Sequence, residues 1–192
     1  NFKFYNPDKF QLEFNKTKNE KKILLTIDDA FLSFYENAWP YLKENKIPFI
    51  LFVSTEAVGK FGYMTWSQIK EIENEKFAFI GNHSHSHEYL INYNFENFKN
   101  DIDKSIKIFK NKIGYNPIFF SYPFGEYSLK QKNYISKNFK FAFGQHSGVI
   151  DLNLLSSPYF SLIGNLGNSN LSLLLSIIPE CCPKAISKFF DI

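Results

Sequence analysis

The sequence predicts an α/β fold in which parallel strands are covered by helices. Short, almost continuously apolar segments alternate along the chain with longer segments in which apolar residues recur every three or four positions. Strands that are apolar on both faces are typical of a parallel sheet buried between layers. Polar clusters directly follow three of these strands, which is where open sheets and closed barrels alike carry functional residues. The pattern itself does not separate an open sheet from a barrel.

The individual elements follow from apolar content and periodicity. Strands are expected at 22–26, 47–53, 77–80, 118–122 and 139–143. Helices are expected at 30–45, 66–73, 95–113 and 129–138, and the third has one continuous apolar face. Pro40 lies inside the first helical pattern, where it is expected to kink or shorten the helix.

Composition limits the classes of protein and partner. The 192 residues are predicted to form one domain, 1–192, because no linker, repeat or low-complexity block divides them. The net charge is only +3 and the lysines are scattered, so no nucleic-acid partner is expected. The apolar run 171–178 is too short for a transmembrane segment, which needs roughly 20 residues. The chain starts at Asn1, which is compatible with removal of an upstream segment, and the sequence specifies neither oligomeric state nor compartment.

Asp28 and Asp29 stand next to each other at the predicted end of the first strand. Two adjacent carboxylates repel each other in an apolar setting unless a proton or a cation lies beside them. A solvated turn or a helix N-cap is the alternative explanation for such a pair. A metal site therefore needs support from a second group of residues.

The histidines provide this support, because His83, His85 and His87 fall within one short segment. In a helical turn His83 and His87 would lie on one face, about 40° apart, while His85 would point away. An extended strand would instead align all three. Two histidines at this spacing bind zinc in known motifs, and one added carboxylate leaves coordination positions open for water and substrate. A catalytic metal site is therefore predicted, with a surface histidine cluster as the alternative.

Three segments together resemble a known family. Residues 26–30 (TIDDA) resemble the T-F-D-D-G motif of the polysaccharide deacetylase (NodB homology) family of carbohydrate esterases. Residues 83–87 (HSHSH) match its H-[S/T]-x-x-H motif, and residues 122–125 (YPFG) resemble its R-x-P-[F/Y]-G motif. The motifs stand in the family's order, and the resemblance covers roughly residues 20 to 150.

The resemblance implies a metal centre and a general base. Asp29, His83 and His87 would hold a divalent metal, most often zinc, with cobalt or manganese as alternatives. The metal would polarise an acetamide carbonyl and lower the pKa of its bound water. Asp28 would accept a proton from that water as it attacks the carbonyl carbon.

The third motif is implied to serve the oxyanion and the substrate. The backbone N–H of Phe124 would stabilise the tetrahedral oxyanion, with Tyr122 and Pro123 beside it. The family also implies a distorted (β/α) barrel with fewer than eight units, an N-acetylated glycan as substrate, and an extracytoplasmic or cell-envelope location.

Three positions depart from the family pattern. Ala30 replaces the usual Gly, and Ser121 stands where many members have the Arg that orients the base. The terminal L-x-H motif, which supplies the general acid, is absent, because no histidine follows His146. We expect His146 to act as a substitute acid; alternatively Asp28 shuttles the proton, or a further C-terminal segment holds the acid. Residues 152–192 match no recognised motif.

These observations lead to one principal function and two alternatives. The principal prediction is metal-dependent removal of N-acetyl groups from an amino-sugar polymer or oligosaccharide. The same constellation would suit another non-peptide C–N bond, such as that of a formamide or a cyclic ureide. A glycan-binding relative without catalysis is the second alternative, because the arginine and the terminal acid motif are missing. Retention of all three predicted metal ligands argues against this last alternative.

Overall fold

A parallel β-sheet forms the centre of the computed structural model, which describes residues 3–9, 22–144, 161–162 and 173–177. The strand order is β1-β2-β3-β4-β5-β6-β7, with β8 also paired to β2. Every pair of neighbouring strands is parallel. The strands are β1 (Lys3–Phe4), β2 (Lys22–Ile27), β3 (Phe49–Val53), β4 (Ala78–Asn82), β5 (Phe119–Ser121), β6 (Phe141–Phe143), β7 (Ser161–Leu162) and β8 (Leu173–Ile177).

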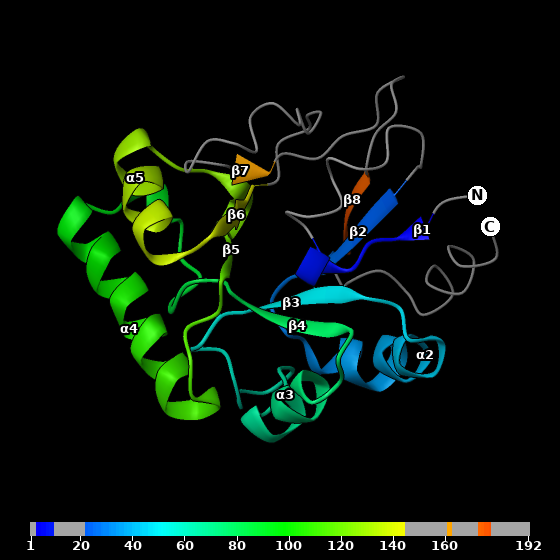
Figure 1. Cartoon of the computed structure of the whole chain (residues 1–192). Helices are drawn as coiled ribbons and strands as arrows, with labels where there is room; N and C mark the ends of the chain where they lie inside the picture. The colour runs from blue at the N-terminus through cyan, green and yellow to red at the C-terminus, as the bar shows by residue number, and fades with distance from the viewer. Residues whose placement is uncertain (1–2, 10–21, 145–160, 163–172, 178–192) are drawn as a thin grey trace.

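The helices cover the outer side of the curved sheet in chain order (Figure 1). They are α2 (Trp39–Asn45), α3 (Trp66–Glu73), α4 (Phe95–Ile113) and α5 (Leu129–Asn138). Single turns of 3-10 helix lie at η1 (Pro7–Lys9), η3 (Leu90–Asn92) and η4 (Pro123–Gly125), and a π-helical segment, η2 (Phe34–Ala38), precedes α2. Strands β2 to β6 form a half-barrel. The prediction of a distorted barrel with fewer than eight units, made of parallel strands covered by helices, is confirmed.

Strand β3 shows why the apolar strands are continuous. All five of its residues are buried, and alternate side chains enter different clusters. Phe49, Leu51 and Val53 pack in the cluster that includes residues of α2 and α3. Ile50 and Phe52 pack in a second cluster with residues of β5 and β6. A third cluster joins the sheet to α4 and α5. Both faces of the sheet are therefore apolar, as expected for a strand covered on each side.

The helix boundaries follow local capping. Thr65 and Ser128 each form a capping box with a glutamine three residues later, and these pairs begin α3 and α5. Asn94 caps α4, which ends at Gly114 in the left-handed conformation. Helices α3, α4 and α5 have the predicted bounds because both their apolar faces and their caps are encoded locally.

The first predicted helix differs from expectation, because 30–45 is not one regular helix. The π-helical segment Phe34–Ala38 lies directly before α2, and Trp39 N–H donates to the carbonyl of Phe34, five residues back. Pro40 lacks an N–H, and its ring crowds the carbonyl four residues earlier in a regular helix. The wider turn of a π-bulge relieves this crowding without ending the helical path.

Strands β1, β7 and β8 were not predicted from the sequence. Strand β8 falls in the apolar run 171–178 and pairs with β2 from Ile23 to Ile27. No helix in the described ranges is long and apolar enough to cross a membrane.

Gly81 in β4 allows Phe52 of β3 to lie flat against the sheet. A methyl group at this position would overlap the Phe52 ring and lie 3.2 Å from Ile50 Cγ2. We predict that Gly81→Ala lowers the free energy of unfolding by about 1–3 kcal/mol through overpacking. Urea denaturation would measure this loss. In a Phe52→Leu background the same substitution should cost less; an equal cost would show that the Phe52 ring is not the obstacle.

Candidate active site

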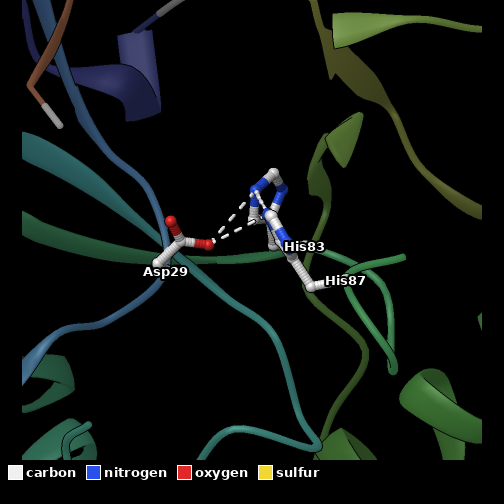
Figure 2. A group of neighbouring side chains, drawn as sticks. All are labelled: Asp29, His83 and His87. Carbon is white, nitrogen blue, oxygen red and sulfur yellow. Dashed lines mark hydrogen bonds and ion pairs between the residues drawn. The ribbon is translucent and has the colours of Figure 1, made fainter. Parts of the chain in front are cut away.

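Three polar segments meet at the carboxyl ends of the strands. Asp28 and Asp29 follow β2, residues 83–87 follow β4, and η4 lies just beyond β5. Figure 2 shows the Asp29 carboxylate and the imidazoles of His83 and His87 pointing toward one another. The expectation that separate motifs form one site is therefore met for these three residues.

The three side chains are close enough to share one ion. His87 Nε2 lies 3.1 Å from His83 Nε2 and 3.1 Å from Asp29 Oδ1. His83 Nε2 lies 3.7 Å from Asp29 Oδ1. Among the residues that the structure describes, they form the one group of at least three potential metal-ligating side chains whose ligand atoms lie within 4.8 Å of each other.

These distances fit a divalent metal. Zinc binds imidazole nitrogen and carboxylate oxygen at about 2.0–2.2 Å, so tetrahedral geometry separates ligand atoms by roughly 3.3–3.5 Å. The observed separations of 3.1, 3.1 and 3.7 Å bracket that range. Two imidazoles and one carboxylate also suit cobalt and manganese, so the donor set does not distinguish among these metals.

His83 is held in the tautomer that a metal ligand requires. Its Nδ1–H donates to the backbone carbonyl of Ser121 at 2.8 Å, which leaves the Nε2 lone pair directed into the site. The His83 side chain is 1% exposed, whereas those of Asp29 and His87 are 19% and 28% exposed. His83 is therefore the innermost of the three side chains, and Asp29 and His87 lie nearer to the solvent.

The histidine segment is not a helical turn. Ser84 and His87 have positive φ angles of 68° and 55°, which a right-handed helical turn does not contain. His85 points away, as expected, and its Nδ1 lies 2.9 Å from Thr55 Oγ1. The interpretation of His83 and His87 as neighbours is confirmed, although the segment forms neither of the two shapes considered, the helical turn or the extended strand. Hydrogen bonds to other segments, described below, determine the local shape.

Left-handed backbone is concentrated around the site. A non-glycine residue in this region carries a conformational cost on the order of 1–3 kcal/mol, and such strain is typical of functional sites. Within the described ranges, six non-glycine residues have positive φ, and five of them belong to the three site segments: Asp29, Ala30, Ser84, His87 and Phe124. Ala30, with φ of 56°, occupies a conformation that glycine adopts more readily, which explains why the family usually has glycine there.

The electrostatics of the site favour a neutral His87. Burial lowers the pKa of His87 below the ordinary histidine value, and the neighbouring His83 lowers it further. Asp29 and Asp28 act in the opposite direction without reversing the shift. Because a metal binds only the unprotonated imidazole, this environment keeps the ligand ready near neutral pH.

Tyr63 lies within electrostatic range of Asp29. Burial, and then the Asp29 charge, raise the pKa of Tyr63. Its ring stacks on that of Phe31 at 4.8 Å between centroids. The loop that contains Tyr63 is tied to the segment after Asp29, because Met64 N–H donates to the Ala30 carbonyl at 2.9 Å. An aromatic pair therefore lies beside the acidic ligand.

The third motif presents its residues in different directions. Tyr122 is 2% exposed and packs in the apolar cluster with residues of α4 and α5, so its side chain is a core residue. Pro123 is also buried. Phe124 is 48% exposed, and its ring lies 5.1 Å from that of His87 and 5.4 Å from that of Tyr89. Phe124 follows Pro123 in η4 and has a left-handed, non-helical backbone with φ of 58°.

Of the predicted general base and general acid, the structure describes only the base, Asp28. Asp28 is 5% exposed at the end of β2, next to the metal-ligand candidate Asp29. Ser121, which replaces the family's arginine, is 3% exposed and contributes its backbone carbonyl to His83. His146, the predicted general acid, lies outside the described residues.

The sequence analysis named Phe124 for its backbone N–H but did not predict that its ring would be exposed at the site. The two tryptophans pack inside the protein instead, Trp39 against Phe49 and Trp66 on Phe109. The ring of Phe124 is exposed beside His87. In a chain with 23 phenylalanines, composition gave no signal that this ring would be exposed; only its place in the third motif could have suggested it.

Comparison with known proteins agrees with this geometry. The model of the polysaccharide deacetylase family matches residues 15–142, which is more than half of the chain. The chain belongs to the polysaccharide deacetylase family. The three candidate metal ligands and the third motif all lie inside the matched part of this deacetylase-family chain.

Individual relatives support the assignment. The chain is 32% identical over 120 residues to a peptidoglycan-N-acetylglucosamine deacetylase of Bacillus cereus, covering 62% of this chain and 42% of that protein. The structure of IcaB from Ammonifex degensii matches with a TM-score of 0.66 at 25% identity, over 76% of this chain and 70% of that one. The Streptococcus pyogenes deacetylase PplD shares the fold, with a TM-score of 0.72 at 22% identity, over 97% and 79%. The match spans about two fifths of the curated relative's length.

We predict that the purified protein binds about one divalent metal ion per chain. His83→Ala and Asp29→Ala should each abolish binding, because two remaining ligands hold an ion poorly. Elemental analysis after incubation with zinc or cobalt and removal of excess ion would measure this. His85→Asn is the matched control from the same segment and should keep the metal, since His85 contacts Thr55 instead. Equal metal content in all variants would show that the ion binds elsewhere.

Proposed function

We propose that this chain is a metal-dependent hydrolase that removes N-acetyl groups from an amino-sugar polymer or oligosaccharide. The observation that carries the proposal is the convergence of Asp29, His83 and His87, with the carboxyl group of Asp28 next in the chain. Family membership supports the reaction class. The names of its relatives support a glycan substrate, and peptidoglycan is the substrate named for one of them.

Each part of the site has a place in the proposed reaction. A divalent metal held by Asp29, His83 and His87 would polarise the acetamide carbonyl and acidify a water molecule. Asp28 accepts the proton of the attacking water, as a buried carboxylate beside the reacting atoms can do. The N–H of Phe124 in η4 donates to the oxyanion that develops on the carbonyl oxygen.

Exposed aromatic groups beside the ligands support a sugar substrate. The Phe124 ring offers an apolar face next to His87, and the ring of Tyr89 also packs against it. Tyr89 O–H donates to Glu126, which leaves polar groups close to that apolar face. A sugar ring presents both C–H faces and hydroxyl edges, so it matches such a surface. A location outside the cytoplasm, where envelope glycans are found, is part of this proposal and rests on the family alone.

Protonation of the leaving amine has two candidate donors. Asp28 could return the proton that it accepted from water, which would require no further residue. His146 remains the predicted substitute acid. If His146 is the donor, His146→Gln should reduce turnover strongly; if Asp28 is the donor, that variant should keep most of its activity.

We predict that the zinc- or cobalt-loaded protein releases acetate from N-acetylglucosamine oligomers or peptidoglycan fragments. Asp28→Asn should lower the rate by about 10²–10⁴-fold, because the amide cannot accept the proton. Enzymatic determination of acetate would measure the rate, and elemental analysis would show that the variant keeps its metal. Asp103→Asn, which changes an exposed carboxylate on α4, is the control and should leave the rate unchanged.

The products separate the proposal from its alternatives. Formate or ammonia in place of acetate would support hydrolysis of another C–N bond. Tight glycan binding without turnover under any of the three metals would contradict the deacetylase proposal and favour a binding protein.

A further inference from the structure

The N–H groups of the segment that carries both histidine ligands bond mostly to side chains. His83 N–H donates to the Val53 carbonyl at 3.0 Å, which continues the pairing of β4 with β3. From Ser84 onward the N–H groups donate to side chains instead. Ser84 N–H donates to Asn82 Oδ1 at 2.8 Å, and His87 N–H donates to Ser84 Oγ at 3.1 Å. The carbonyls of Ser84 and His85 accept the N–H groups of Thr55 and Glu56 at 3.2 and 3.0 Å. Side-chain acceptors for its N–H groups and the loop after β3 therefore determine the path of the segment together.

The two N–H groups at the middle of the segment share one acceptor. His85 N–H donates to Asp101 Oδ1 at 2.8 Å, and Ser86 N–H donates to Asp101 Oδ2 at 3.0 Å. Asp101 is on α4 and is 8% exposed, so its carboxylate faces the segment from within the protein. Each oxygen takes one of two consecutive N–H groups, which fixes the orientation of the peptide between His85 and Ser86. Hydrogen bonds to a charged acceptor are roughly twice as strong as neutral ones.

A second contact with α4 holds the start of the same segment. Asn82 is fully buried, and its side-chain amide donates to Ser105 Oγ at 2.8 Å. Ser105 lies four residues after Asp101, so both side chains are on the same face of α4. Asn82 in turn receives Ser84 N–H. Helix α4 therefore contacts the ligand segment at two points, one of them through the carboxyl group of Asp101.

The segment needs this support because it is strained. Ser84 and His87 both adopt left-handed backbone, at a cost on the order of 1–3 kcal/mol each. Without external acceptors, the backbone would relax to other conformations, and the imidazoles of His83 and His87 would separate. The positions of Nε2 of both residues, 3.1 Å apart, depend on a backbone that local sequence does not favour.

We propose that Asp101 is a positioning residue for the metal centre. It holds His87 in the geometry of a metal ligand by accepting hydrogen bonds from the N–H groups of His85 and Ser86. The hydrogen bonds of Asp101 described above go to backbone N–H groups and not to the metal-ligand atoms. Asp101 acts through the backbone between the two ligands. The inference rests on the proposed function, because it assigns Asp101 a role toward the metal that this function requires.

Asp101→Asn tests the inference with little change of volume. The amide keeps one oxygen acceptor but turns an NH₂ group toward the second N–H, so one hydrogen bond is lost and two donors face each other. Titration of metal-free protein with zinc and cobalt, in competition with a chromophoric chelator, would give the dissociation constants. We expect Asp101→Asn to raise the zinc dissociation constant about 10- to 100-fold. Asp103→Asn, an exposed carboxylate on the same helix, should stay within about twofold of wild type.

A second measurement separates positioning from general support of the fold. Urea unfolding with and without zinc gives the stabilisation that the ion confers, which shrinks as its affinity for the folded state falls. We expect this zinc-dependent increment to shrink in Asp101→Asn beyond any loss in the metal-free protein. Equal loss with and without zinc, together with an unchanged dissociation constant, would overturn the inference while leaving the proposed function intact. Failure of the wild-type protein to bind either metal would overturn both.

Discussion

The register of three parallel strands is the constraint on which the site depends. Leu51 of β3 is paired with Ile27 of β2 on one side and with Ile80 of β4 on the other. Asp29 and His83 therefore leave the sheet at the same edge, two strands apart. Strands separated by one neighbour are roughly 10 Å apart, a gap that an aspartate and a histidine leaning toward each other can bridge. A shift of one residue in either pairing would turn the side chains to the opposite face.

The sheet brings the ligands to one edge, but it does not finish the site. Beyond the last ladder hydrogen bond, the chain reaches its final positions through left-handed residues at Asp29, Ser84, His87 and Phe124. These conformations persist because buried acceptors on α4 and backbone contacts across the loops hold them. Strand pairing thus sets the approximate place of the ligands, and α4 together with the loop contacts sets their orientation.

This division explains what the sequence predicted. Elements with local signals were predicted to within a few residues of their observed bounds. These are the apolar strand β3 and the helices α3, α4 and α5 with their caps. The metal ligands were found because their residue types and their order along the chain are unusual. The sequence left open whether residues 83–87 form a helical turn or an extended strand. Their actual shape could not be predicted, because the acceptor for two of their N–H groups, Asp101, lies outside the segment and carries no motif. The interruption before Pro40 was foreseen, but its π-helical form depends on geometry that periodicity does not encode.

The contact between His83 and Ser121 has a consequence for how this site tolerates change. Nδ1–H of His83 donates to the main-chain carbonyl of Ser121, not to its side chain. Every amino acid carries that carbonyl, so replacement of the residue at position 121 leaves the acceptor in place as long as β5 keeps its path. The tautomer of His83 therefore does not depend on which side chain stands at position 121, where this chain departs from its family. Substitutions at that position can accumulate without disturbing the hydrogen bond that orients this histidine.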